Sequence, residues 1–349
     1  MKFATQLTRT ISPAGMGLAI LFLVVMLILP YWGSPYIMTV ATTVFYLALI
    51  GQSWNIMLGF AGLLSIGHAL FVGIGSYAAA YLFTALGVPP INGVFPAVLL
   101  AVLVGIFVGY LGFRFAIGGV YFALLTIAFA EFVRILVDHT SWLGAAQGYF
   151  LKVSAADRKG IDLVNLRGAP EMYYYLSMAL ALGALLLCWF LLHSRLGYYW
   201  QAIRDDEEAA QSVGVNVFRY KMFAVAVSSA LAGVAGVFYA FYQNSLFPEI
   251  VFNIERSIEV TLGPIVGGVG TLIGPVFGVF LLTPLGELIT DLIDILKSWG
   301  VIDKNAKLDG LKLLVWGFIV ALIVLFKPKG LWPWFRDRLG LVRAPATRK

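Results

Sequence analysis

The sequence has little of what disulfides, metal sites and soluble surfaces are built from. It contains one cysteine, Cys188, and three histidines, none of them in an H-x-x-H or H-E-x-x-H pattern. A single thiol cannot form a disulfide or a cysteine-based metal site within one chain. Charged residues make up only 12% of the chain, about half their share in soluble domains. Metal catalysis, a disulfide framework and a water-facing surface are therefore all disfavoured.

Apolar residues dominate instead, at 60% of the 349 residues, with a mean hydropathy of +0.90. This composition is typical of membrane proteins. The net charge of +6 is concentrated at the chain ends and in short loops, without a basic patch carrying interleaved aromatics. We therefore expect membrane lipid, and no nucleic acid, around this chain.

Ten apolar stretches predict an all-α, polytopic membrane protein in which residues 1–349 form one transmembrane domain. Backbone groups in hydrocarbon must find partners within their own segment, which continuous apolar runs achieve as helices. The eighth and ninth stretches are short, so we expect them to tilt little or to be partly re-entrant. The predicted spans are 16–32, 37–58, 63–86, 94–112, 117–137, 172–193, 222–242, 256–270, 275–290 and 311–327.

The distribution of Lys and Arg predicts the orientation of these spans. Ten crossings put both termini on one side, and that side receives more Lys and Arg than the other, which favours cytoplasmic termini. The N-terminal stretch has the polarity of a signal peptide but lacks a small-residue cleavage site, so we interpret it as an uncleaved first span. Residues 194–221 and the basic tail 328–349 then face the cytoplasm, and loop 138–171 faces outward.

The segment 194–221 carries eight charged residues between two apolar blocks. Asp205 or Asp206 is a suitable N-cap for a short helix, and Gly214 suits the left-handed residue that ends one. Such a helix would have about eight residues and a length of about 12 Å. Ala209, Ala210 and Gly214 would give it a small-residue face on which a partner protein can sit.

The run Glu208-Ala209-Ala210-x-x-x-Gly214 resembles the EAA loop of permease subunits in bacterial ABC importers. Five further stretches, in matching order, resemble the LivM-like side of the branched-chain amino acid permease family: 51–82 (GQSWNIMLGF…), 121–131 (YFALLTIAFAE), 214–240 (GVNVFRYKMF…), 267–278 (GGVGTLIGPVFG) and 325–333 (LFKPKGLWP). One departure is SWLGAAQGYF at 141–150, where relatives commonly carry T-G-G-x-x-G.

The resemblance implies the ABC importer permease fold and a role as a transport subunit in the bacterial inner (plasma) membrane. The implied partners are a homologous permease subunit that completes a heterodimer, two ATP-binding subunits and a periplasmic binding protein. The implied cargo is leucine, isoleucine or valine, and other amino acids, urea or short amides remain alternatives. Residues matching the coupling loop are Arg204, Asp205, Asp206, Glu208, Ala209, Ala210 and Gly214. No G-x-x-x-x-G-K-[ST] motif is present, so we expect no cofactor and no enzymatic activity in this chain, with ATP bound by partner subunits.

Polar residues inside predicted spans are candidates for the translocation pathway, because polar groups in hydrocarbon are costly. These candidates are Gln52, Asn55, His68 and Glu131. For His68 a hydrogen-bonded packing role is the alternative, and Glu131 could simply pair with Arg134. Glu255 and Glu259, with Arg256, could line the path or dock a binding protein, and Glu287 receives no role. The glycine-rich stretch holds candidates for helix packing or a hinge: Gly267, Gly268, Gly270, Gly274 and Pro275.

Two other classes of function are weaker interpretations. An ion-coupled secondary transporter would need mid-span acids in several helices, whereas the acids here lie mostly at span ends. A membrane enzyme, such as an intramembrane hydrolase, would need paired carboxylates, a nucleophile motif or H-E-x-x-H, and the sequence has none of these.

Overall fold

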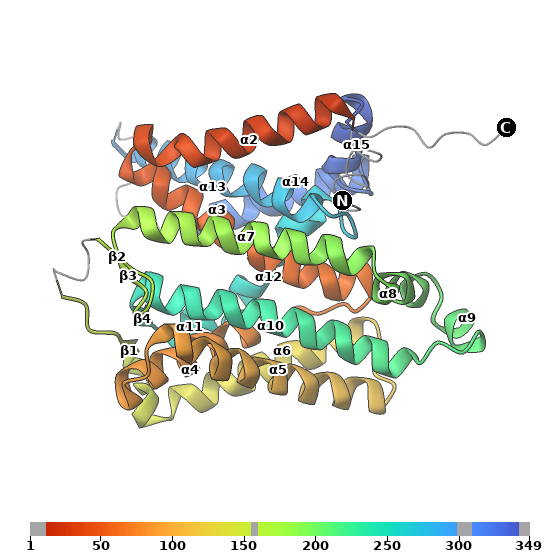
Figure 1. The fold of residues 1–349 in the computed structure, drawn as a ribbon, viewed down its shortest axis with the longest axis horizontal. Helices are drawn as coiled ribbons and strands as arrows, with labels where there is room; N and C mark the ends of the chain where they lie inside the picture. Colours follow the sequence, from red (N-terminus) through yellow and green to blue (C-terminus); the bar gives the residue numbers. More distant parts are fainter. Residues whose placement is uncertain (1–11, 155–159, 299–308, 342–349) are drawn as a thin grey trace.

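The computed structural model describes residues 12–154, 160–298 and 309–341. Within them, eight helices are long and apolar enough to cross a membrane (Figure 1). They are α2 (Pro13–Trp32), α3 (Pro35–Asn55, continued by a π-helical turn, Ile56–Phe60), α4 (His68–Leu86), α5 (Pro90–Arg114), α6 (Val120–Asp138), α7 (Pro170–Leu192), α10 (Val217–Gln243) and α13 (Gly274–Ser298). A ninth crossing is possible if α14 (Asp309–Phe326) and α15 (Leu331–Arg338), bent by 56°, form one broken span.

The predicted all-α membrane architecture is confirmed, and three predicted spans differ from the structure. The ninth, expected to be short or partly re-entrant, is the full-length helix α13 with 25 residues. The third begins at His68 instead of residue 63, because residues 61–67 form a loop in which Gly62 has φ +72°. The eighth corresponds to α12 (Ile254–Gly267), which has 14 residues. At 1.5 Å per residue it is about 21 Å long, too short to cross a hydrocarbon core of about 30 Å.

Both ends of the described chain meet at one end of the bundle. Ser12 caps α2 by accepting a hydrogen bond from the Gly15 amide, and its own N–H donates to the carbonyl of Leu341 over 2.9 Å. Two short helices, α8 (Arg195–Asp205) and α9 (Glu207–Ser212), lie at this same end (Figure 1). This arrangement agrees with termini and segment 194–221 on one side; the cytoplasmic assignment of that side stays a prediction.

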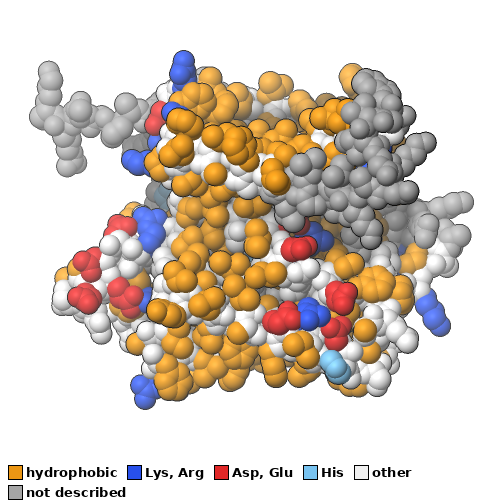
Figure 2. All heavy atoms as spheres, turned by 180° about the vertical axis from the view of Figure 1, so that it is seen from behind, with side chains coloured by type: hydrophobic (Ala, Val, Ile, Leu, Met, Phe, Trp, Pro, Cys, Tyr) orange, Lys and Arg blue, Asp and Glu red, His pale blue; other side chains and the backbone are white. Residues whose placement is uncertain are grey.

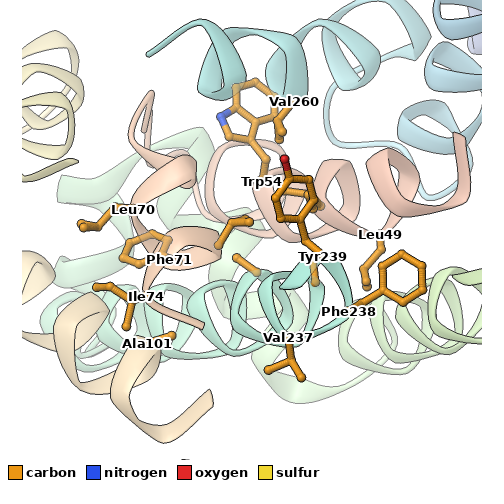
Figure 3. Packing of buried hydrophobic residues seen from close by; sticks show 14 of the residues in the cluster. Leu49, Trp54, Leu70, Phe71, Ile74, Ala101, Val237, Phe238, Tyr239 and Val260 are labelled. Atoms are coloured by element: carbon orange, nitrogen blue, oxygen red, sulfur yellow. The ribbon is translucent and has the colours of Figure 1, made fainter. Parts of the chain in front are cut away.

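Small residues let the central helices approach closely. A Cβ atom on Gly75 of α4 would lie 2.4 Å from the carbonyl oxygen of Gly233 in α10, and one on Gly236 would lie 2.1 Å from that of Val72. Such approach is the main route to tight association where lipid provides no hydrophobic drive. Large side chains fill the adjoining space between α3, α4, α10 and α12, as Trp54, Phe71 and Tyr239 illustrate (Figure 3).

The outer surface of the bundle is apolar over a broad area (Figure 2). Helix α2 is the extreme case, with Ile20 and Leu21 about 60% exposed. Exposed aliphatic side chains on a helix of this length are expected where lipid or another membrane subunit covers them.

Opposite α8 and α9, short strands tie the loops together. Strand β1 (Tyr149–Phe150) pairs antiparallel with β4 (Ser245–Leu246), and β2 (Ile161–Asp162) pairs with β3 (Arg167–Gly168). The sequence analysis did not predict these strands, because two-residue strands leave no periodic pattern. Hydrogen bonds from Asn165 hold the pKa of Asp162 below its usual range. The same loops contain two 3-10 turns, Ser141–Leu143 and Ala145–Gln147, and helix α11 (Pro248–Val251).

Candidate functional site

The predicted N-cap and the predicted left-handed glycine are both present at helix α9. The Asp206 carboxylate accepts a hydrogen bond from the Ala209 amide over 2.9 Å, which is an N-cap. Gly214 has φ +88°, and the next residue, Val215, donates its N–H to the carbonyl of Ala210. The helix has six residues instead of about eight, because its last turn closes early through these bonds.

One side of α9 sits on a small apolar cluster of its own chain. Ala210 is buried against Ile203 of α8 and Val217 of α10. The prediction that Ala210 belongs to an exposed partner face is therefore wrong, because an apolar helix side is covered by the nearest apolar neighbours. Ala209 and Gly214 are exposed as predicted, and Val213, which the sequence analysis missed, is 79% exposed. An isolated valine at the end of a charged segment gives little signal in a sequence.

Acidic side chains surround the start of α9. Glu207 and Glu208 occupy its first turn and are exposed. Both favour the positive end of the helix dipole. Glu207 also pairs with Lys221 of α10, which fixes the helix to the membrane-spanning part of the chain. Glu208 and Ala209 are thus presented outward from a helix held at its base.

Arg204, predicted to face a partner, reaches into its own chain instead. Its Nη1 donates to the carbonyl oxygen of Gly59 over 2.6 Å, and its guanidinium also pairs with Asp205. Gly59 lies in the π-helical turn after α3, where the last carbonyls of a helix lack intrahelical partners. A basic side chain satisfies such a carbonyl well. The contact joins α8 to the end of α3.

Gln52 and Asn55 share one face of α3, as predicted, and hold the turn between α12 and α13. Asn55 accepts a hydrogen bond from the Gly270 amide over 2.8 Å and donates to the Thr271 carbonyl over 2.9 Å. Gln52 donates to the Leu272 carbonyl over 2.7 Å. Both side chains are fully buried. Their contacts serve the backbone of this turn, and a role in the pathway stays a prediction.

The glycines of this turn are in close packing contact. A Cβ atom on Gly267 would lie 1.7 Å from the Gly274 carbonyl oxygen, and one on Gly270 would lie 2.9 Å from both the Gly59 carbonyl oxygen and Arg204 Nη1. Gly268 has φ +127° and faces the carbonyl of Lys329. A Cβ atom on Gly51 of α3 would lie 3.7 Å from the Cβ of Pro275, the second residue of α13. The packing interpretation is thereby confirmed, and the hinge remains a prediction.

His68 lies at the start of α4 and is fully buried. Its Nε2 is 3.0 Å from the Ser228 hydroxyl, and its Nδ1 is 3.4 Å from the Ser65 hydroxyl. Ser53 bonds to Ser228 in turn. These contacts link α3, α4 and α10 and match the packing role considered for this histidine.

Glu131 lies on α6 in a charged row with two neighbours. Its carboxylate is 2.5 Å from Arg134, which also reaches Asp138 over 2.8 Å. The predicted Glu131–Arg134 pair is therefore confirmed. Glu131 is 49% exposed, so its carboxylate remains accessible to another molecule, and a pathway role stays a prediction.

These features define a class: a polytopic helical membrane protein with a short capped helix presented at one end of the bundle. The model of the family "Branched-chain amino acid transport system / permease component" matches residues 36–326, and the chain belongs to this family. It is a transport component and a multi-pass protein of the bacterial inner membrane.

Individual relatives agree with this assignment. The chain is 28% identical to the LivM permease of the high-affinity branched-chain amino acid transport system of Escherichia coli, over 93% of this chain and 78% of the relative. The corresponding Salmonella typhimurium LivM is also 28% identical, over 92% and 76%. The LsrC permease of the autoinducer 2 import system of Yersinia pseudotuberculosis is 26% identical, over 64% and 58%. No solved structure was found to match the chain.

Proposed function

We propose that this chain is one membrane half of an ATP-driven importer and that α9 is the helix through which ATP-binding subunits move it. One observation carries the proposal: α9 presents Glu208 and Ala209 outward while its other side is fixed to α8 and α10. A helix that is exposed on one side and packed against its own chain on the other can transmit the movement of a partner into the bundle.

The contacts beneath α9 give that push a physical route. Arg204 joins α8 to the end of α3, and Asn55 in α3 bonds to the turn between α12 and α13. Movement of α8 would thus be transmitted to α3 and to the α12–α13 pair together. This contiguous set of polar contacts supports coupling between α9 and the α12–α13 pair.

The proposed transporter contains several further subunits. We expect a homologous permease subunit as the second half, two ATP-binding subunits and a periplasmic binding protein. ATP would be bound by the partner subunits, because this sequence lacks the phosphate-binding loop of ATPases. The chain itself would hold no cofactor.

The cargo we propose is a branched-chain amino acid, in keeping with the names of the LivM relatives. Related amino acids, urea and short amides are the alternatives, and the LsrC relative shows that similar chains carry names of different cargo.

The test of α9 is charge reversal at its exposed surface. We expect Glu208→Arg and Gly214→Arg each to abolish ATP-dependent leucine uptake in cells, because a bulky cation then stands where the partner seats. The amount of chain in the membrane fraction should not change, because Glu208 is exposed and nothing lies within 4 Å of a Cβ atom on Gly214. Gly214→Arg also strains the φ +88° residue that ends α9, so Glu208→Arg is the variant that tests the surface alone.

Asp337→Arg, an exposed charge reversal on α15 at the same end of the bundle, is the matched control. It should leave uptake intact. Normal uptake in the Glu208→Arg protein would refute the coupling role of α9.

A further inference from the structure

A second charged feature of the chain lies away from α9, on the half-length helix α12. Arg256 and Glu259 are three residues apart and pair over 2.7 Å through Nη1 of the guanidinium. Neither side chain is buried: they are 22% and 23% exposed on the surface of the single chain. The two side chains therefore form a close ion pair, and part of the surface of each remains exposed.

The pair lies within the apolar thickness of the bundle. Helix α12 runs from the loops near β4 to the turn beside Arg204, and Glu259 is eight residues before its end, about 12 Å at 1.5 Å per residue. On the neighbouring helix α3, Tyr46, which stacks against the Tyr239 ring beside Arg256, is about 16 Å from Pro35 by the same rise. Arg256 is the third residue of α12, so the pair lies at the start of this half-length helix and beside a part of α3 that is well inside that helix.

Aromatic rings line the inner side of the pair. The Arg256 guanidinium lies 5.6 Å from the centre of the Tyr239 ring, which stacks against Tyr46. Tyr239 extends from α10 toward α12, the helix that carries Val260 (Figure 3). The inner side of the pair is thus lined by the tyrosines of α10 and α3.

A charged surface at this depth is not expected to face lipid. A charged side chain at the centre of a bilayer costs about 2.5–3.5 kcal/mol even on the mildest scale, and such residues usually face a bundle interior or a water-filled cavity. Charged side chains do interrupt the otherwise apolar face of the molecule (Figure 2). We therefore expect the surface around Arg256 and Glu259 to face the inside of the assembled transporter.

We infer that Arg256 and Glu259 form a recognition point for the two opposite charges of a free α-amino acid in the translocation path. The guanidinium would receive the carboxylate, and the Glu259 carboxylate would receive the ammonium group. A guanidinium offers five N–H donors, and the Glu259 contact in the described structure uses Nη1. The remaining edge can bind a carboxylate without first breaking the pair.

The same chemistry discriminates among cargo classes. An α-amino acid carries an ammonium group and a carboxylate group on the same carbon, which matches a neighbouring anion and cation. Urea and simple amides carry no charged group that could bind to either side chain. Desolvated charged hydrogen bonds of this kind are among the stronger contacts that proteins make. The ion pair therefore favours an amino acid over urea or an amide.

This inference rests on the proposed importer function, and the experiment separates the two. The whole transporter, purified through a tag on this chain and placed in liposomes with its binding protein, is assayed for ATP hydrolysis and for uptake of leucine, isoleucine, valine and urea. The test variant is Arg256→Met with Glu259→Leu, because replacing an ion pair by apolar side chains of similar size generally preserves folding. The single variant Glu259→Gln removes one charge and keeps the shape.

We expect the double variant to hydrolyse ATP at the wild-type rate while amino acid uptake falls roughly 30-fold or more, the loss typical of a removed charge contact. Glu259→Gln should raise the leucine KM with less effect on the maximal rate. Arg336→Gln, which removes an exposed guanidinium on α15, is the control and should transport normally.

Other outcomes contradict one proposal or the other. Wild-type leucine uptake by the double variant would show that the pair is structural and would overturn the inference. Uptake of urea in preference to amino acids by the wild-type transporter would also overturn it, with the importer function intact. Absence of any ATP-dependent uptake by the wild-type complex would instead count against the proposed function.

Discussion

Two polar regions inside this apolar chain differ in how they are used. Around Asn55, neutral amide groups are fully buried and each bonds to backbone atoms of the turn between α12 and α13. Around Arg256, two full charges pair with each other and remain partly exposed. Both regions involve α12, at opposite ends of the same short helix.

The difference teaches that polarity within a span does not by itself indicate a pathway. A buried amide that satisfies backbone groups removes a cost that hydrocarbon would otherwise impose. A charged pair that stays accessible carries a desolvation cost within the membrane, and folding of the chain does not require such a pair. Exposure and charge together, more than polarity, separate a binding surface from a structural contact.

The largest effect that this comparison predicts is on stability, at Asn55. We expect Asn55→Leu to lower the free energy of unfolding by about 2–6 kcal/mol, because the Gly270 N–H and the Thr271 carbonyl would each lose a partner at about 1–3 kcal/mol per buried group. Thermal unfolding of the purified chain in detergent, followed by circular dichroism, measures this.

The Arg256→Met, Glu259→Leu protein is the matched comparison in the same assay and should unfold near the wild-type temperature. The reverse result, with Asn55→Leu unaffected and the double variant unfolded, would invert the assignment of the two regions.

A smaller effect is expected at Arg204, on coupling more than on folding. Its guanidinium is partly exposed, so Arg204→Met should cost little stability. Loss of the bond to the Gly59 carbonyl should nevertheless weaken communication between α9 and α3. Coupling free energies are typically about 1–3 kcal/mol, or roughly 5- to 150-fold, and we expect leucine uptake per ATP hydrolysed to fall within that range.

Arg219→Met is the control, because Arg219 is exposed on the first turn of α10 and no described contact joins its side chain to α3. If both variants retained the wild-type ratio of uptake to hydrolysis, the route from α8 to α3 would carry no coupling.

Local features of this molecule could be predicted from its sequence, and long-range contacts could not. The Asp206 cap and the Gly214 stop follow from residue types a few positions apart. The Asn55 contact joins residues 215 apart, and no pattern in one sequence signals it. The same face of α3 was predicted from the spacing of Gln52 and Asn55, but the spacing could not say what that face touches.

The other wrong predictions concern which side chains are buried. Ala209 and Ala210 are equivalent in the sequence, yet only Ala210 is buried, because Ile203 and Val217 approach from two other helices. Arg204 is predicted to belong to the coupling loop through the resemblance alone, and its guanidinium instead donates a hydrogen bond to the Gly59 carbonyl of its own chain. Each error concerns where a side chain points, which depends on packing that is distant in the chain.

The smallest effect on the bundle is expected from these two adjacent alanines, which test whether α9 is an anchored lever. Ala210→Asp places a carboxylate against Ile203 and Val217 and should release α9 from its base, raising amide hydrogen exchange in residues 206–215. Ala209→Asp adds the same charge on the exposed side and should leave exchange unchanged. The overall unfolding temperature should hardly change in either variant, because this cluster is separate from the main core.

Both variants should lose leucine uptake, one through a loosened helix and the other through a blocked surface. Equal exchange in the two proteins would show that α9 is not anchored through Ala210.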